Sequence, residues 1–453
     1  MQKNKKIILK ITNHSDADAI RKLKKEDNNL FKIYYDRSDA IAVVDVVEQG
    51  VFYRKWFLFN QLFFFGANVH FYNFDIIQNN YFKLLEVNDG KLISLGLSES
   101  KIESIEALSG CNSLVSLDLS HTKINNLSPL SNCIDLKYLS LEDCSEITDI
   151  SPLANCPNLT YLFISNNSKI IDFSPLSCCH NLTHLAIRGC VNISDGVFLS
   201  KLDKLRSLDL YSSPIPDLFP LSNLKNINKV NLQYNDKLKN ISALSSLKSL
   251  EFLVICENKI IQDLTPLDNL TNLQFLAVAN CRKLSNISSL SNLRNLTHLM
   301  LSFIGHTTDD MVFSLSKLIN LKYLCLRGFS FSNLDFIKNL VNLEHLNLNY
   351  NDITNVSSLT NLTKLRKLEL QSNSITDCKE LFNVKSLEFL NISDNYINHN
   401  INFLTEMPNL KNVFVSHNSE FEVINEVKTV DFAGIIDDDD SYLEAQDREC
   451  DHL

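Results

Sequence analysis

The residues of this sequence that could take part in chemistry are its twelve cysteines and eleven histidines. Thiolate and imidazole groups act as nucleophiles, general bases or zinc ligands where they stand at compact spacing in the chain. Here no His/Cys cluster has such a spacing, and no Gly-rich phosphate loop is found in a chain with only 10 glycines. The sequence therefore predicts no metal, no cofactor and no catalytic residue, and the chain is not expected to be an enzyme.

Cys256 and Cys325 are the cysteines that come closest to a reactive role, because both fall on a face expected to meet solvent. A reactive thiol needs a basic neighbour that lowers its pKa, and the sequence identifies none. Four further cysteines stand three residues before a recurring leucine motif, where later units carry leucine: Cys111, Cys133, Cys156 and Cys179. Cysteine in that place is expected to be a small buried hydrophobic residue, and the set to be free thiols in a reducing compartment.

The recurring motif L-x-x-L-x-L explains where these residues stand. It begins at Leu92 and returns fifteen times in all, at spacings of 22 to 25 residues, until Leu410. A fixed period of this length is the mark of a repeat architecture. The fourth and sixth residues of each motif alternate inward, as the period of two in a strand requires. Each occurrence therefore predicts a short strand.

A second periodic position lies eight residues after the first leucine of each motif. It holds a small polar residue or cysteine in most units: Asn167, Asn235, Asn258, Asn351, Asn373, Asn395, Asn418, Cys144, Cys190 and Cys281. A buried side chain there is expected to hydrogen-bond the turning backbone, whose polar groups would otherwise stay unpaired. Ile304 and Phe329 break the series beside the one 25-residue spacing, which predicts a local irregularity.

The second half of many units reads S-P-L or similar, as in Ser128-Pro129-Leu130. Proline after serine or threonine suits the first position of a short helical turn, where its missing N–H costs nothing. Three units are longer or patterned differently, and they are expected to carry longer helices on the convex side: Asn192–Leu202, Gly305–Leu318 and Asn398–Met407.

Residues 92–418 resemble the short, 22-residue class of leucine-rich repeats. Their S-P-L-x-N-L wording is similar to the bacterial internalin group and to the related phosphatase-regulating repeats of eukaryotes. The resemblance implies an α/β solenoid, a leucine-rich-repeat horseshoe of about fifteen repeats with a parallel β-sheet on its concave face. Unlike secreted internalins, the sequence shows no signal peptide and no wall-anchor motif, and no ubiquitin-ligase domain is recognisable.

Residues 1–90 do not share the repeat. Lys6–Thr12 reads as a strand, Ser15–Lys25 as a helix capped by Ser15, and Ala40–Val47 with Val51–Phe59 as a hairpin. These elements predict a small α+β domain, or an enlarged cap that covers the open end of the solenoid. We expect the repeats over 91–418, a C-terminal cap over 419–436 and a disordered acidic tail over 437–453.

The charge and the apolar segments exclude several classes of partner. A net charge of −10 and a pI of about 5.6 do not favour nucleic-acid binding. The stretch Phe57–Phe65 is too short to span a bilayer, and the N-terminus lacks an uninterrupted apolar core of a signal peptide. We expect a cytoplasmic, monomeric protein, or one secreted into a host cell without a cleavable signal peptide.

In such repeats the third, fifth and seventh motif positions face solvent on the concave sheet and form the candidate partner surface. The column is rich in aromatic residues flanked by arginine, the composition in which interface energy concentrates. The predicted partner-binding residues are Tyr138, Tyr161, Phe163, His184, Arg188, Tyr211, Phe252, Val254, Phe275, His298, Met300, Tyr323, Arg327 and His345. For any single residue, simple cross-strand pairing of aromatic side chains is the better explanation. For the column as a whole, partner binding is favoured, because an aromatic strip is costly to leave in water.

The resulting hypothesis is a protein–protein interaction module, which includes the case of a bacterial effector that acts in a host cell. One alternative is an enzyme with catalytic residues in 1–90 that uses the repeats to select its substrate. Another is a regulatory protein of a protein phosphatase, by analogy with the eukaryotic repeats alone.

Overall fold

The computed structural model describes residues 7–11, 19, 22–23, 32–35, 42–46, 85–89, 91–193, 195–304, 309–398 and 401–418. The described repeats fall into two compact units, divided between Ile261 and Gln262. The predicted N-terminal domain and the boundary at residue 90 stay predictions. The predicted C-terminal cap and acidic tail lie outside the described residues.

Near the N-terminus, three antiparallel strands form a small sheet in the order β1-β3-β2. They are β1 (Ile7–Ile11), β2 (Lys32–Tyr35) and β3 (Ala42–Val46). The strands expected at Lys6–Thr12 and Ala40–Val47 are thus confirmed, while β2 was not foreseen. The second strand of the expected hairpin, Val51–Phe59, lies outside the described residues, and β3 pairs with β1 on one edge and with β2 on the other. Most of the helix expected at Ser15–Lys25 lies outside the described residues, with Ala19, Lys22 and Leu23 helical.

The first unit contains eight parallel strands that follow one another in chain order. They are β5 (Lys91–Gly96), β6 (Ser116–Asp118), β7 (Tyr138–Ser140), β8 (Tyr161–Phe163), β9 (His184–Ala186), β10 (Ser207–Asp209), β11 (Lys229–Asn231) and β12 (Phe252–Val254). A further strand, β4 (Leu85–Asn88), pairs antiparallel with β5. This pairing occupies the edge that the first repeat would otherwise leave open.

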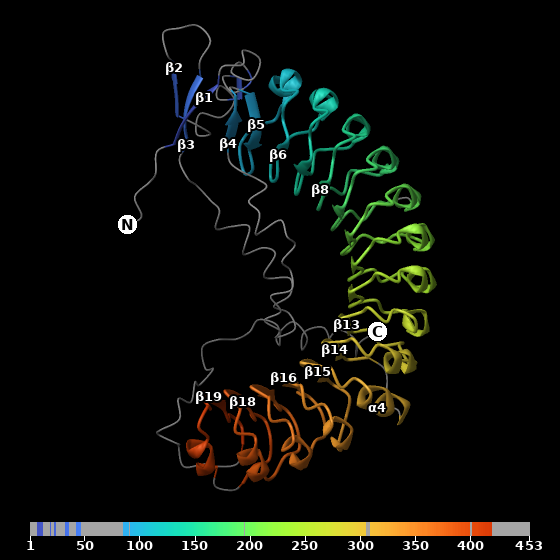
Figure 1. Cartoon of the computed structure of the whole chain (residues 1–453), viewed down its shortest axis with the longest axis vertical. Helices are drawn as coiled ribbons and strands as arrows, with labels where there is room; N and C mark the ends of the chain where they lie inside the picture. Colours follow the sequence, from blue (N-terminus) through green and yellow to red (C-terminus); the bar gives the residue numbers. More distant parts are fainter. Residues whose placement is uncertain are drawn as a thin grey trace, which may run out of the picture. The chain divides into compact units, whose positions relative to one another are not determined.

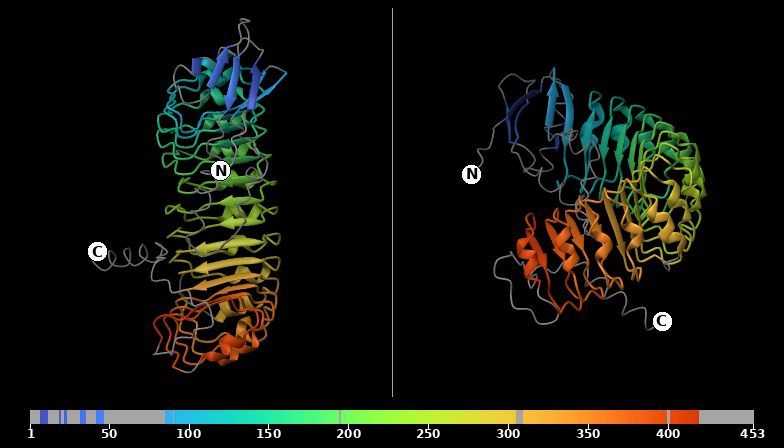
Figure 2. Two further views of the ribbon diagram at one scale, coloured as in Figure 1. Left: turned by 90° about the vertical axis from the view of Figure 1, so that its left-hand side faces the viewer. Right: turned by 60° about the horizontal axis from the view of Figure 1, so that its bottom comes forward.

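The second unit holds seven more parallel strands in chain order. They are β13 (Phe275–Ala279), β14 (His298–Ser302), β15 (Tyr323–Arg327), β16 (His345–Asn347), β17 (Lys367–Glu369), β18 (Phe389–Asn391) and β19 (Asn412–Phe414). The fifteen parallel strands β5–β19 confirm the expected number of repeats. The strands of each unit lie side by side in one layer (Figure 2).

Short helices return the chain from each strand to the next. In the first unit these are 3-10 helices: η1 (Glu106–Gly110), η2 (Ser128–Asn132), η3 (Ser151–Asn155), η4 (Ser174–Cys178), η5 (Val197–Lys201), η6 (Phe219–Asn223) and η7 (Ser242–Ser246). In the second unit they are η8 (Thr265–Leu267), η9 (Ser288–Asn292), α4 (Asp309–Ser316), η10 (Asp335–Ile337), η11 (Ser357–Leu359), η12 (Lys379–Asn383) and η13 (Asn402–Glu406). In each unit the strands line the inner side of the ribbon and these helices the outer side (Figure 1).

One of the three longer helices that we expected is present. The repeat that contains residues 305–318 carries the α-helix α4, because its 25-residue spacing supplies the extra residues that an α-helical turn needs. The other two expectations are wrong. Asn192–Leu202 and Asn398–Met407 hold the five-residue 3-10 helices η5 and η13, as their 23-residue spacing allows.

The core lies between strands and helices, where the repeated leucines up to Leu390 are buried at 0 to 1% exposure, as at Leu136 and Leu139. The predicted ladder is confirmed: the Asn167 side-chain amide donates to the carbonyls of Leu141, Ile164 and Ser165 at 2.7, 2.9 and 3.0 Å. In other repeats a cysteine thiol donates the equivalent hydrogen bond. The Cys144 thiol, for example, donates to the carbonyl of Leu119 at 3.0 Å.

Where Phe329 replaces the ladder residue, the bonds that the next repeat makes in regular parts of the ladder are kept. Asn351 Oδ1 accepts hydrogen bonds from the backbone N–H groups of Phe329 at 3.2 Å and Phe331 at 3.0 Å. The Phe329 ring is itself buried against the Phe331 ring. The irregularity expected in this region is therefore real, and it replaces a polar side chain by an aromatic one.

The cysteines that precede the motif leucines are buried free thiols, as expected. Cys156 donates to the carbonyl of Leu130 at 3.5 Å, and Cys179 donates to the carbonyl of Leu153 at 3.3 Å. Burial raises the pKa of both thiols to about 12, so they stay protonated at neutral pH.

Candidate partner-binding face

The sheet register places the third motif positions of neighbouring strands directly beside one another. In the first unit Tyr138 pairs with Tyr161, and Tyr161 pairs with His184. Their rings stack, with centroids 5.0 Å apart for Tyr138–Tyr161 and 4.4 Å apart for Tyr161–His184. We call these three residues, together with Phe163 on β8, the inner aromatic cluster.

All four members of the inner aromatic cluster are half-buried. Their lateral stacking follows from the 22- and 23-residue spacings, which return the chain to the same register in each repeat. Each stacked pair stabilises the sheet by about 0.5–1.5 kcal/mol beyond the area it buries. Thr183 Oγ1 lies 2.8 Å from His184 Nδ1 and so holds the imidazole in the row.

A second row of rings crosses the strands of the second unit. Ring centroids are 6.2 Å apart for Phe275–His298, 6.0 Å for His298–Tyr323 and 6.1 Å for Tyr323–His345. Burial, with the positive charge of Lys322 as a smaller cause, lowers the pKa of His298 to about 4. Burial also lowers the pKa of His345. Both imidazoles are therefore neutral at physiological pH.

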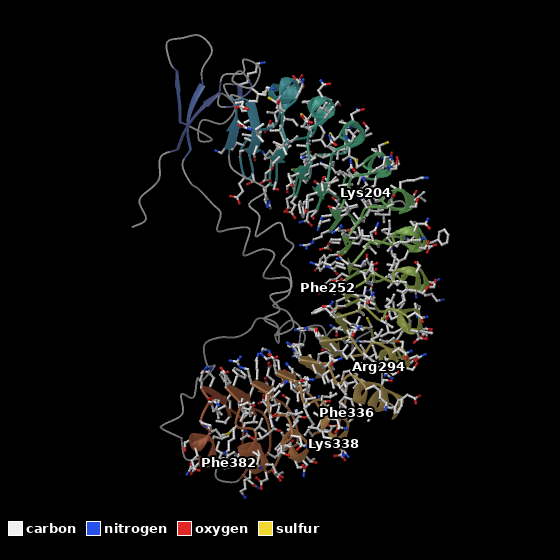
Figure 3. All side chains as sticks on the ribbon, viewed as in Figure 1. Lys204, Phe252, Arg294, Phe336, Lys338 and Phe382 are labelled. Atoms are coloured by element: carbon white, nitrogen blue, oxygen red, sulfur yellow. The ribbon has the colours of Figure 1, made fainter. Side chains whose placement is uncertain are left out.

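The expected solvent exposure of this face is wrong for six of its predicted binding residues, five of them apolar or aromatic and the sixth Arg188. Val254 is 1% exposed, and Phe275 and Met300 are each 4% exposed. Phe252 and Tyr323 are also buried. Fifth-position side chains such as Val254 and Met300 lie between those of the third and seventh positions, which flank them. Figure 3 shows Phe252 on the inner side of the first unit. Because these side chains are buried, substituting them would disturb the packing of the sheet rather than a contact with a partner.

The two predicted arginines are already engaged within the chain. Arg188 is buried, and its Nε donates to Asp209 Oδ2 at 2.6 Å. Asp209 also accepts a hydrogen bond from the Asn231 amide at 3.1 Å. The Arg327 guanidinium carbon lies 5.3 Å from the Tyr350 ring centroid, within cation–π range. Of the two, only Arg327 keeps the half-exposed position that a partner contact requires.

Tyr211, the remaining predicted binding residue, is half-buried at the seventh position of its repeat. Its ring meets the Tyr234 ring edge-on, with centroids 5.1 Å apart. Burial, partly offset by the charge of Arg188, raises the pKa of the Tyr211 phenol. This residue therefore continues the first unit's sheet face beyond the inner aromatic cluster as a neutral hydrogen-bonding group.

The thiols singled out on this face are not activated. Cys256 is 1% exposed. Burial raises the pKa of Cys325 to about 11, although Arg327 partly opposes the rise. Within the described part of the chain, no group of three or more His, Cys, Asp or Glu side chains is arranged to hold a metal ion. None of the helices in that part of the chain has the length and apolarity needed to cross a membrane.

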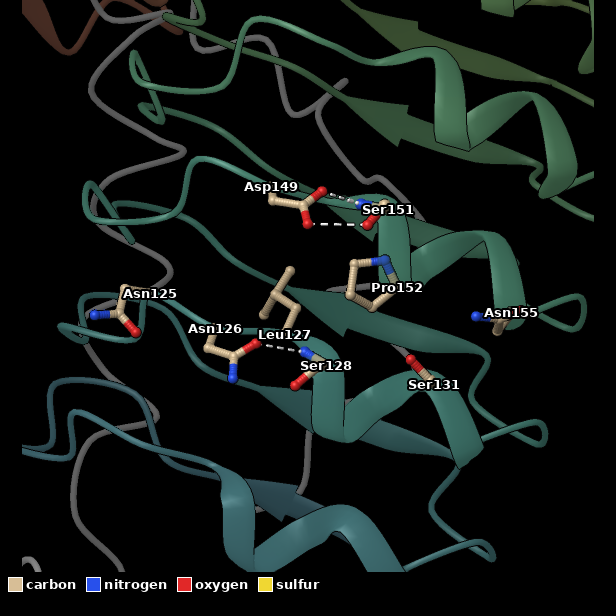
Figure 4. A pocket seen from close by; sticks show the side chains of 9 residues that line it. All are labelled: Asn125, Asn126, Leu127, Ser128, Ser131, Asp149, Ser151, Pro152 and Asn155. Atoms are coloured by element: carbon tan, nitrogen blue, oxygen red, sulfur yellow. Dashed lines mark hydrogen bonds between the residues drawn. The ribbon is translucent and has the colours of Figure 1, made fainter.

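A polar groove of about 280 Å³ lies at the N-terminal ends of η2 and η3 (Figure 4). Its polar groups serve the fold: Asp149 Oδ1 accepts from the Ser151 backbone N–H at 2.7 Å, and Asn126 Oδ1 accepts from the Ser128 backbone N–H at 2.9 Å. The lining is completed by Asn125, Leu127, Ser131, Pro152 and Asn155.

These bonds belong to a series that the sequence analysis missed. In most repeats an Asp or Asn accepts a hydrogen bond from the backbone N–H two residues later, at the first residue of the helix. Such side chains satisfy N–H groups that a helix start leaves unpaired. The signal was present, because Asp or Asn precedes S-P-L by two residues in unit after unit. The acceptors are Asn126, Asp149, Asp172, Asp195, Asp217, Asn240, Asp263, Asn286, Asn333, Asn355 and Asp377.

Comparison with known proteins agrees with this architecture. A family model described as Leucine Rich repeats (2 copies) matches residues 134–178 and 341–383. No curated protein sequence matches the chain. Among solved structures, an internalin (InlF) from Listeria monocytogenes is 30% identical; the match covers 68% of this chain and 87% of that one, with a TM-score of 0.59.

Two further structures share the fold at lower identity. A leucine-rich-repeat protein from Leptospira interrogans is 20% identical, with coverage of 75% of this chain and 95% of its own and a TM-score of 0.64. The functional domain of InlJ from Listeria monocytogenes, described as including a cysteine ladder, is 22% identical over 71% of this chain and 67% of its own, with a TM-score of 0.54. The repeats, their register and the internalin match show that this chain belongs to the internalin-type leucine-rich-repeat proteins.

Proposed function

We propose that the chain is a non-enzymatic interaction module whose partner protein binds the sheet face of the first unit, over the inner aromatic cluster. Leucine-rich-repeat proteins in general bind other proteins, and proteins of the internalin type are typically scaffolds without enzymatic activity. The partner's contact with this particular face is the new element of the proposal.

The stacked row Tyr138–Tyr161–His184 carries the proposal. Aromatic side chains dominate interface energies when they are partly exposed and become fully desolvated on binding. The rings here are already ordered by stacking at 5.0 and 4.4 Å. These rings would therefore lose little conformational entropy when a partner covers them. Phe163 and Tyr211 extend the same half-buried surface to the next motif positions.

The burial of Phe252, Phe275 and Tyr323 makes them poor choices for testing the proposal. The double substitution Tyr138→Ser, Tyr161→Ser is better, because Ser116 and Ser207 already occupy the same row on neighbouring strands. Lys229→Ser is the matched control, since Lys229 lies in that row outside the cluster.

The chain is used as bait in lysate, and a retained protein is purified and titrated against all three forms by calorimetry. We expect the double variant to bind at least about 10-fold more weakly, while the control stays within about 2-fold. Thermal melting must first show that the variants are folded. A partner that binds the double variant as tightly as the unchanged chain would place the interface elsewhere.

A further inference from the structure

Exposed apolar side chains occur in three consecutive repeats of the first unit, and two of them lie on the outer helices. Phe219 is 70% exposed, Val197 and Ile171 are each 61% exposed, and Val191 is 51% exposed. Single exposed apolar residues are ordinary on protein surfaces. Val197 and Phe219 lie on the packed neighbouring helices η5 and η6, and adjoining exposed apolar residues are the form that interaction sites take.

The two most regular members occupy one equivalent position in adjacent repeats. Val197 is the first residue of η5 and Phe219 is the first residue of η6, and η4, η5 and η6 pack side by side. They belong to the row of helices on the outer side of the unit (Figure 1). Six other repeats place a hydroxyl residue at this position: Ser128, Ser151, Ser174, Ser242, Thr265 and Ser288.

The fold does not require valine or phenylalanine at this position. The backbone N–H of Val197 donates to Asp195 Oδ1 at 2.9 Å, and that of Phe219 donates to Asp217 Oδ1 at 2.9 Å. Serine makes the same backbone bond in neighbouring units, as Ser174 does with Asp172 at 2.8 Å. The apolar side chains therefore add exposed surface without adding an intramolecular contact that serine lacks at the cap.

Negative charge accompanies the apolar patch. The helix starts of η4, η5 and η6 are capped by Asp172, Asp195 and Asp217, whereas neutral Asn126 and Asn240 cap η2 and η7 equally well. Hydrogen bonds from Ser174 lower the pKa of Asp172, which keeps it ionised. Carboxylates are thus not needed for capping, yet four stand in succession from Asp149 to Asp217, and the last two cap the helices that begin with Val197 and Phe219.

We propose that this outer patch, made of Val197, Phe219, Asp172, Asp195 and Asp217, binds a basic, apolar segment of a partner protein. An aliphatic or aromatic side chain of the partner covers Val197 and Phe219, and lysine or arginine side chains meet the carboxylates. Charge complementarity selects this occupant. Acidic lipid head groups would be repelled by the carboxylates, and a second copy of the chain would place like charges opposite one another.

The test uses substitutions that neighbouring repeats already tolerate. Val197→Ser with Phe219→Ser removes the apolar surface and restores the residue found in other units. Asp172→Asn with Asp195→Asn and Asp217→Asn removes the charge and keeps the cap, as Asn126 and Asn240 do. The matched controls are Phe313→Ser on α4, whose side chain is 59% exposed, and Asp263→Asn, which caps η8.

The full-length chain is immobilised and used to select from a displayed random-peptide library, and selected peptides are titrated by fluorescence anisotropy. We expect them to combine Lys or Arg with Leu, Phe or Trp. Their affinity should fall about 10-fold or more in the serine variant. It should fall about 5-fold or more in the asparagine variant, and also when salt rises from about 0.05 to 0.5 M. Both controls should bind as the unchanged chain does.

Three outcomes would overturn the proposal: no enrichment, enrichment of acidic peptides, or equal affinity for the serine variant. Binding of phosphatidylserine vesicles that depends on Phe219 would assign the patch to membranes instead. A dimer in sedimentation that the serine variant loses would assign it to self-association. The sheet-face variant Tyr138→Ser, Tyr161→Ser should leave peptide binding unchanged, so this test succeeds or fails independently of the proposed function.

Discussion

The imidazole of His298 lies almost parallel to the phenol ring of Tyr323, with the planes 16° apart and the centroids 6.0 Å apart. The two residues are 25 positions apart in the chain and directly opposite one another in the β14–β15 register. The same imidazole faces Phe275 on its other side, with centroids 6.2 Å apart. This packing explains why His298 resists protonation.

The stability of the second unit should therefore depend on pH through His298. Its pKa is about 4 in the folded chain against an ordinary 6.5, so the unfolded chain binds more protons between these values. By linkage, the free energy of unfolding should fall as pH drops from about 6.5 to about 4. Replacing His298 with Phe, the residue at the equivalent position of β13, should flatten this dependence.

The measurement is urea unfolding of both forms at several pH values across that window. His345 contributes in the same direction, because its pKa is also lowered by burial, so some slope should remain in the variant. Equal slopes for the two forms would show that His298 is not the titrating group.

Each ladder asparagine should contribute more to the free energy of unfolding than a side chain with one hydrogen bond would. Asn167→Ala removes three hydrogen bonds and leaves the carbonyls of Leu141, Ile164 and Ser165 buried without that donor. We expect a loss of about 2–4 kcal/mol in the free energy of unfolding. Asn167→Cys should lose clearly less, because Cys144 and Cys190 act as donors at equivalent positions. Denaturant titration of the two variants gives the comparison, and an equal loss in both would contradict the hydrogen-bond explanation.

Arg188 should act in folding rather than in binding. Arg188→Met leaves the Asp209 side chain, which is 1% exposed, without its cation. Removing one partner of a buried pair costs about 3–5 kcal/mol. The double variant Arg188→Met, Asp209→Asn should recover part of that loss, since the uncompensated charge is gone. Thermal or urea unfolding tests the order of stabilities, and a fully stable single variant would return Arg188 to the list of partner contacts.

Among the described residues, thiol reactivity should separate the exposed Cys178 from the buried Cys156 and Cys179. Cys178 is exposed, whereas its chain neighbour Cys179 is buried with a pKa raised to about 12. Under native conditions iodoacetamide should label Cys178 within minutes, while Cys156 and Cys179 should be labelled only after unfolding. Peptide mass spectrometry of the labelled protein distinguishes the sites, and Cys178→Ser serves as the control. Native labelling of Cys156 would show that the row opens.

The sequence by itself determined the repeat and much of its register. Spacings of 22 to 25 residues between motif leucines predict fifteen strands, and β5–β19 are those strands. The roles of Asn167 and Cys144 were likewise predictable, because a turning backbone needs a buried donor at a fixed distance from each motif. These features are local and periodic, so a one-dimensional pattern contains them.

Accessibility and pairing were decided by the tertiary structure. The alternation of a strand tells which side Val254 and Met300 point to, but their burial depends on what surrounds them. The sequence predicts Arg188 as a partner contact, whereas in the structure its side chain donates a hydrogen bond to Asp209 on the next strand. The pairing of β3 with both β1 and β2 was likewise not visible in the sequence. Such outcomes depend on contacts between residues distant in sequence, and a periodic pattern does not encode those contacts.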